Sequence, residues 1–186
     1  MNNKVAKMVV VLTFTAILAG GVLALVYRVA APLIEENRLR ELKEAIFVVL
    51  PEAKDYETIE KDDLVIYKGV DENGKTVGFS FVADGPGFQG KIKMMVGLNI
   101  DLLRLKGMKV LEQVETPGLG NRIGEDDFQN QFKGLNFRPK IEYIKNKKPE
   151  KPNQIQTITG ATISSKAVVE TLNKEIKAIM EVLKGD

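Results

Sequence analysis

The sequence predicts an α+β domain joined to an N-terminal membrane anchor. Two observations lead to this prediction: an uncharged apolar stretch near the N-terminus, and a series of short strand patterns that ends in one long amphipathic helix. Hairpin signals separate the strands, which favours a mainly antiparallel sheet with flanking helices. The length of 186 residues suits one anchor and one domain of ordinary size.

The apolar stretch occupies residues 8–27 and reads MVVVLTFTAILAGGVLALVY. At about 1.5 Å per residue it is roughly 30 Å long as a helix, which matches the hydrocarbon core of a bilayer. A cleavable signal peptide has a shorter apolar region of about 7–15 residues, so we expect a retained transmembrane helix at residues 8–28. Lys4 and Lys7 precede it, which places residues 1–7 in the cytoplasm and the bulk of the chain outside the inner membrane.

A second helical pattern covers residues 29–51. Pro32 suits the first turn of a helix and Pro51 ends the pattern. We predict a membrane-proximal helix that lies on the domain formed by residues 52–186. Its apolar side chains recur at spacings of three and four and are Leu39, Leu42, Ile46, Val49 and Leu50.

Strand patterns fill the first part of the domain. Residues 64–70 and 76–83 flank an Asn73-Gly74 pair, which supplies the positive φ that a tight hairpin needs. A turn is expected at residues 106–107, and the Lys- and Pro-rich residues 145–153 read as a solvated loop whose charge needs no ligand. Further strands are predicted at residues 91–100, 108–114 and 137–144.

A short strand at residues 154–159 and a helix at residues 164–184 complete the domain. The strand alternates polar and apolar residues, and Gly160 permits a sharp turn before the helix. The helix has one apolar face, formed by Val168, Leu172, Ile176, Ile179, Met180 and Leu183.

The composition narrows the chemistry. The chain contains no Cys and no His, which excludes Cys-ligated clusters, His-ligated haem, the usual zinc sites and Ser–His or Cys–His nucleophiles. We therefore expect no resident metal and no catalytic residues, although carboxylate metal sites and Ser/Lys dyads stay open. The net charge of +2 argues against nucleic-acid binding. Any electron transfer must use an organic cofactor.

Three Gly-rich segments stand where a packed core does not require glycine: residues 84–90 (DGPGFQG), 115–120 (ETPGLG) and 159–162 (TGAT). The last one precedes the long helix, whose N-terminus presents unpaired N–H groups and partial positive charge that favour a phosphate. The alternative is that its hydroxyls are ordinary N-caps. Candidate phosphate-binding residues are Thr162, Ser164, Ser165 and Lys166.

Residues 115–120 also allow two interpretations. Pro117 and Gly118 are typical of a structured turn. Gly118 and Gly120 would equally let the backbone approach a flat ligand, with Leu119 packed on its face.

Taken together, GFQG–KIKMMVG, VLEQVETPGLG and TITGATISSKAV resemble the RnfG (RsxG) subunit of the Rnf electron-transport complex and the related NqrC subunit of sodium-pumping NADH:quinone reductase. The resemblance covers nearly the whole chain. It implies an extracytoplasmic FMN-binding domain with FMN joined through its phosphate to the hydroxyl of Thr162. It also implies that Thr159, Gly160 and Ala161 complete the attachment motif, that Ser164, Ser165 and Lys166 neighbour the phosphate, and that Glu115, Thr116, Pro117, Gly118, Leu119 and Gly120 lie against the flavin.

The implied function is that of an electron-relay subunit in a complex that moves electrons between ferredoxin and NAD while exporting sodium ions or protons. Such a subunit has no complete active site of its own. Its implied partners are the other membrane and cytoplasmic subunits, membrane lipid and, during maturation, a flavin transferase. The family's motif has Asp three residues before the first Thr, where this chain has Gln156. Two alternatives stay open: a flavin-free membrane-anchored scaffold or binding module, and a free-standing extracytoplasmic flavin reductase.

Overall fold

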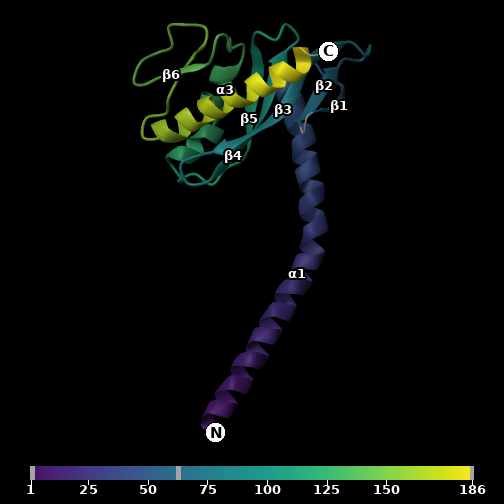
Figure 1. Ribbon diagram of the computed structural model, residues 1–186, viewed down its shortest axis with the longest axis vertical. Coiled ribbons are helices and arrows are strands. Elements are labelled where there is room, and N and C mark those ends of the chain that lie inside the picture. Colours follow the sequence, from purple (N-terminus) through teal and green to yellow (C-terminus); the bar gives the residue numbers. More distant parts are fainter. Residues whose placement is uncertain (1–2, 62–63, 185–186) are drawn as a thin grey trace. The chain divides into compact units, whose positions relative to one another are not determined.

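The computed structural model describes residues 3–61 and 64–184. Its first element, α1 (Asn3–Val49), is long and apolar enough to cross a membrane, by length and composition (Figure 1). The helix is continuous through Pro32, where the sequence predicted that a second helix begins. Proline keeps a helical φ, so it interrupts hydrogen bonding locally without ending the helix. The chain divides into two compact units between Glu41 and Leu42.

The second unit contains a five-stranded antiparallel sheet in the order β1-β2-β3-β4-β5, together with a separate parallel pair, β6 and β7. This architecture confirms the predicted α+β class. The large sheet consists of β1 (Asp55–Lys61), β2 (Leu64–Val70), β3 (Thr76–Pro86), β4 (Lys91–Asn99) and β5 (Leu105–Glu112). The remaining elements are η1 (Gly120–Gly124), α2 (Asp126–Gln129), η2 (Asn130–Phe132), β6 (Glu142–Ile144), β7 (Gln154–Gln156) and α3 (Thr162–Lys184).

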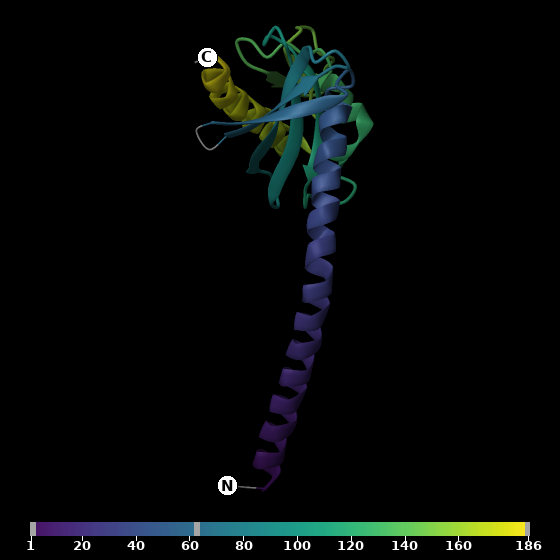
Figure 2. The ribbon, with the colours of Figure 1, turned by 90° about the vertical axis from the view of Figure 1, so that its right-hand side faces the viewer.

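Strand β4 shows how the sheet is buried on both faces. Successive side chains of a strand point to opposite faces. Met94 and Val96 therefore join the main core under α3, whereas Met95 joins a smaller core with Ile46 and Val49 at the end of α1. The last turns of α1 and the whole of α3 accordingly lie on opposite sides of the sheet (Figure 2). Helix α3 contributes Val168, Val169, Leu172, Ile176, Ile179 and Met180 to the main core.

The structure corrects the predicted strand pattern at several points. Strand β5 begins at Leu105, so residues 106–107 lie inside a strand, and the predicted turn there is wrong. The chain turns instead through Leu102, which has a φ of 52°, while the Asp101 carboxyl accepts the N–H of Leu103. Only Glu142–Ile144 of the predicted strand at residues 137–144, and only Gln154–Gln156 of that at residues 154–159, are strands. Strand β1 was not predicted, because its exposed charged side chains hide the alternation.

Gly97 in β4 permits the close approach of α1 to the sheet. A Cβ atom there would lie 2.6 Å from the Val49 carbonyl oxygen and 3.0 Å from the Val49 Cβ. Because a backbone oxygen cannot rotate away, we expect Gly97→Ala to lower the free energy of unfolding by about 1–3 kcal/mol. Chemical denaturation of the two chains measures this change. Gly124→Ala, whose added Cβ would have nothing within 4 Å, is the control, and equal losses in both variants would contradict the packing argument.

Candidate functional site

The parallel pair of β6 and β7 brings two distant segments to one edge. Ile144 pairs with Gln156, and the N–H of Thr157 donates to the carbonyl of Ile144 at 2.9 Å, which extends the ladder by one step. Because parallel strands end at the same edge, the residues after Ile144 and the residues after Gln156 leave the pair side by side. Residues 145–146 therefore lie beside the TGAT segment that leads into α3.

A cavity of about 410 Å³ lies at this edge. Its size falls within the range of about 300–1,000 Å³ that is usual for small-molecule sites. Two of the Gly-rich segments contribute most of its wall, and the third contributes one side chain. The lining residues are Phe88, Glu115, Thr116, Leu119, Gly120, Lys145, Asn146, Thr159, Gly160, Ala161, Thr162, Ile163 and Ser164.

Glu115 connects the ETPGLG turn to the DGPGFQG segment and to the first turn of α3. Its side chain is 4% exposed, and its Oε1 accepts the backbone N–H groups of Phe88 and Gln89 at 2.8 and 2.9 Å. Its Oε2 accepts a short hydrogen bond from the hydroxyl of Ser164 in the first turn of α3. Three donors satisfy a carboxyl group that would otherwise be costly to bury. The carboxyl group thereby holds residues 88–89 and the first turn of α3, which directly follows the TGAT segment, against the ETPGLG turn.

Two glycines make room for this carboxyl group. A Cβ at Gly87 would lie 2.5 Å from Glu115 Oε1, and a Cβ at Gly120 would lie 2.6 Å from Glu115 Oε2 and from Ser164 Oγ. Both contacts are shorter than real Cβ atoms show, so each glycine is required by close approach. Close packing around Glu115 therefore explains the glycine at these two positions.

Thr162 is the first residue of α3 and lines the cavity with its side chain half-buried. Among the described residues, none forms a hydrogen bond with its hydroxyl. The neighbouring hydroxyls are committed: Ser164 donates to Glu115, and Ser165 donates to the carbonyl of Ala161 at 2.9 Å. Ser165 Oγ also accepts the N–H of Ile158 at 3.0 Å. Of these three hydroxyls, only that of Thr162 is available to a ligand.

Four residues singled out by the sequence do not line the cavity. Ser165 is fully buried below it, and Lys166 pairs with Glu170 at 3.4 Å on the helix surface. Pro117 and Gly118 form the back of the ETPGLG turn, where Gly118 has a φ of 75° and donates its N–H to Asn121 Oδ1 at 2.8 Å. The structure brings the other nine together at the cavity: Glu115, Thr116, Leu119, Gly120, Thr159, Gly160, Ala161, Thr162 and Ser164.

The structure adds four lining residues that the sequence did not single out: Phe88, Lys145, Asn146 and Ile163. Phe88 and Ile163 are neighbours of motif residues in the sequence. An apolar side chain next to a motif glycine or threonine was therefore the signal that could have identified them as lining residues. Lys145 and Asn146 had no such signal, because their position depends on the pairing of β6 with β7.

Apolar side chains at the cavity are unusually exposed. Phe88 is 61% exposed, Leu119 46% and Ile163 58%. Large side chains left open to water around one cavity indicate a surface that is covered when a flat apolar group binds. Leu119 also packs closely against Gly160, where an added Cβ would lie 3.2 Å from Leu119 Cδ2. Glycine at this position therefore leaves room for the Leu119 side chain at the cavity.

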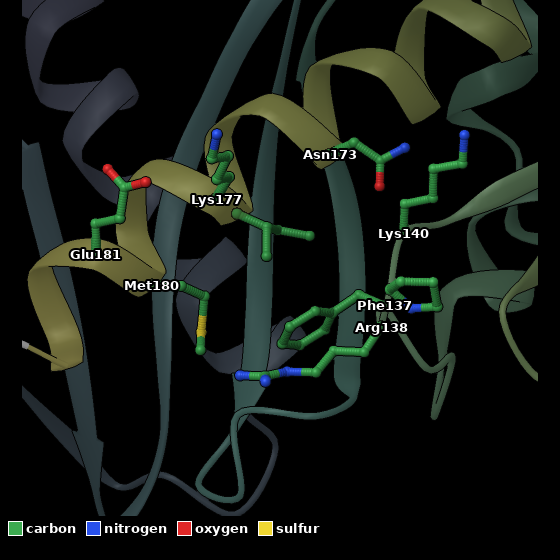
Figure 3. Close-up of a pocket in the computed structure, with 9 residues that line it drawn as sticks. Phe137, Arg138, Lys140, Asn173, Lys177, Met180 and Glu181 are labelled. Carbon is green, nitrogen blue, oxygen red and sulfur yellow. The ribbon is translucent and has the colours of Figure 1, made fainter.

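A larger cavity of about 840 Å³ lies elsewhere, between residues 137–140 and the C-terminal half of α3 (Figure 3). Arg138, Lys140, Lys177 and Glu181 stand around an apolar floor that includes Met180. Its described lining residues include no part of the Gly-rich segments, no helix N-terminus and no hydroxyl. We therefore place the candidate cofactor site at the smaller cavity, where these features converge.

The family model for the FMN-binding domain matches residues 87–177, so the cavity lies in a flavin-binding class of domain. This match spans the three Gly-rich segments apart from residues 84–86. In fold, the chain is similar to NqrC of Shewanella oneidensis, with a TM-score of 0.54 and 21% identity over 70% of this chain and 74% of that one.

Several relatives match nearly the whole chain, and two of them are more than 30% identical to it. The G subunit of the ion-translocating oxidoreductase complex of Methanosarcina acetivorans is 33% identical over 94% of both chains. The G subunit of the Na⁺-translocating ferredoxin:NAD⁺ oxidoreductase complex of Acetobacterium woodii is 31% identical over 97% of this chain and 94% of that one. The chain belongs to the RnfG family, the G subunits of ion-translocating oxidoreductase (Rnf) complexes.

Proposed function

We propose that this chain is the electron-relay subunit of a membrane-bound ion-translocating ferredoxin:NAD oxidoreductase complex and carries FMN joined by a phosphoester to Thr162. The observation that carries the proposal is the free hydroxyl of Thr162 at the cavity of an FMN-binding domain. Related chains that are named as subunits of such complexes support the proposed role in the complex.

The residues at the cavity fit FMN. The first turn of α3 offers backbone N–H groups and the positive end of the helix dipole, which favour the phosphate. Phe88, Leu119 and Ile163 offer exposed apolar surface for the ring. When bound, FMN supplies one- and two-electron redox chemistry, and the protein supplies position and electrostatics. A covalent tether keeps the cofactor at the site whatever the supply outside the cytoplasm.

The proposal includes a location and partners. Helix α1 would span the inner membrane once, with Lys4 and Lys7 on the cytoplasmic side and the FMN-binding domain outside. Its partners would be membrane lipid, the other membrane and cytoplasmic subunits of the complex and, during maturation, a flavin transferase. The reaction centres for ferredoxin and NAD would lie on other subunits, because no catalytic group of this chain is required for a relay.

Intact mass of the full chain, co-expressed with its native flavin transferase, tests the proposal. We expect an increment equal to FMN less water, together with flavin fluorescence of the denatured chain in a gel. Both readouts require a covalent bond, since free FMN is lost on denaturation.

Gln156→Asp provides a second arm of the same experiment. Gln156 N–H donates to Gln131 Oε1 at 2.7 Å and its carbonyl accepts from Gln131 Nε2 at 3.2 Å, so the backbone stays in place when the side chain is changed. We expect a larger modified fraction in this variant, because Asp restores the family's motif. If neither chain gains the FMN increment, the proposed attachment is wrong and the flavin-free scaffold becomes the better interpretation.

A further inference from the structure

The cavity has a single cation among its described lining residues. That cation is Lys145, the residue directly after β6, and it lies exposed at the edge of the cavity. The only carboxyl group in the described lining is that of Glu115, which is already bonded to three donors. No described residue forms an ion pair with Lys145, whereas Lys151 further along the same loop pairs with Glu142 at 4.0 Å.

The backbone conformation around Lys145 places this residue at the cavity. The chain leaves β6 beside the segment that leaves β7, because Thr157 continues the ladder to Ile144. The next residue, Asn146, has a φ of 56°, a left-handed conformation that few residues other than Gly, Asn and Asp adopt. Asn146 also lines the cavity, so the reversal of the loop occurs at the site itself. Unusual backbone conformations of this kind gather at functional sites.

We propose that Lys145 is the residue that sets the redox potential of the bound flavin, by placing a positive charge beside the ring. This inference rests on the proposed function, since it needs FMN in this cavity. One electron passes from a one-electron donor, the preceding redox centre of the complex, to the flavin ring. With FMN bound, the donor would lose one electron and the flavin would gain it, so the charge beside Lys145 would become more negative by one until a proton is taken up.

The physical reason is electrostatic. Lys145 attracts the negative charge of the reduced ring and has no matching interaction with the neutral oxidised ring, so it stabilises one redox state more than the other. Differential stabilisation of this kind shifts an equilibrium, whereas equal stabilisation would not. The phosphate would not need this cation, because the N–H groups at the start of α3 would bind it.

The test compares Lys145→Gln with Lys145→Arg in the flavin-loaded full chain. We expect the glutamine variant to reduce the one-electron equilibrium constant for flavin reduction about three- to tenfold, the upper end of which is a downward shift of about 59 mV. The arginine variant should keep the potential of the unchanged chain. Redox titration followed by flavin absorbance, at low ionic strength, measures the shift, and added salt should reduce it.

Lys147→Gln is the matched control, because Lys147 belongs to the same loop but does not line the cavity. An unchanged potential in Lys145→Gln, or an equal shift in both glutamine variants, would overturn the proposal. A loss of attached FMN in Lys145→Gln without a shift in potential would also overturn it, since the lysine would then serve the phosphate. The intact mass of each variant reports attachment separately, so failure of the Thr162 linkage is distinguishable from failure of the role proposed for Lys145.

Discussion

Replacing Thr162 by Ala is expected to abolish covalent flavin attachment completely. The variant removes one hydroxyl and one methyl group from the first residue of α3, where the side chain is half-buried. The neighbouring hydroxyls cannot take its place, because Ser164 is bonded to Glu115 and Ser165 to Ala161. The expected readout is an intact mass without the FMN increment and a chain that does not fluoresce in a denaturing gel.

Thr162→Ser is the control for this variant. It keeps the hydroxyl and loses only the methyl group, so we expect modified chain to remain detectable. Both variants should unfold within about 1 kcal/mol of the unchanged chain, because neither removes a hydrogen bond between described residues. An FMN increment that persists in Thr162→Ala would contradict the assignment and direct attention to Thr159, which also lines the cavity.

The same variant tests the role in electron transfer. In membranes that contain the assembled complex, we expect Thr162→Ala to lower ferredoxin-dependent NAD⁺ reduction to the level of membranes that lack this chain. A relay without its cofactor interrupts the path, although all protein contacts remain. Unchanged activity with a flavin-free chain would support the scaffold alternative.

The elements predicted well are those whose pattern is local. The amphipathic face of α3, the Asn73-Gly74 hairpin and the buried runs of β2 and β4 are each decided by side chains within a few residues of one another. Gly74 indeed has a φ of 75°. Errors arose where local and tertiary preferences compete. Gly107 was interpreted as a turn residue, but it lies opposite Gly97 in the β4–β5 ladder.

In the candidate site, too, the features predicted from the sequence are local, and the features missed depend on tertiary structure. The TGAT and ETPGLG segments were identified from their own residues, and both line the cavity. The contribution of Lys145 and Asn146 was not predictable, because it depends on a parallel pairing between three-residue strands separated by nine residues of loop. The position of Glu115 was predictable as part of a motif, whereas its three hydrogen-bond partners, which come from two distant segments, were not.

Because Glu115 has these three partners, we expect Glu115→Ala to lower both the stability of the domain and flavin attachment, an effect second only to that of Thr162→Ala. The alanine chain would lose all three hydrogen bonds, leave the N–H groups of Phe88 and Gln89 without their acceptor, and open a void between Gly87 and Gly120. Because three hydrogen bonds are lost and a void is left, we expect the free energy of unfolding to fall by about 2–4 kcal/mol. Because the carboxyl group holds the cavity walls together, the fraction of chain that carries FMN should fall as well.

Two further variants separate this architectural role from a general effect of charge. Glu115→Gln keeps an oxygen that accepts both backbone N–H groups, and the Ser164 hydroxyl can rotate to accept from the new amide, so most of the stability and the flavin should remain. Glu112→Ala removes a carboxyl group that pairs with Lys93 at the surface and is 57% exposed, and it should change stability by less than about 0.5 kcal/mol. Denaturant titration and intact mass on the same preparations measure both properties. Equal damage in Glu115→Gln and Glu115→Ala would mean that the negative charge of Glu115 itself is required at the start of α3, although that charge would repel a phosphate bound there. Hydrogen bonding alone would then not explain how Glu115 holds the cavity walls.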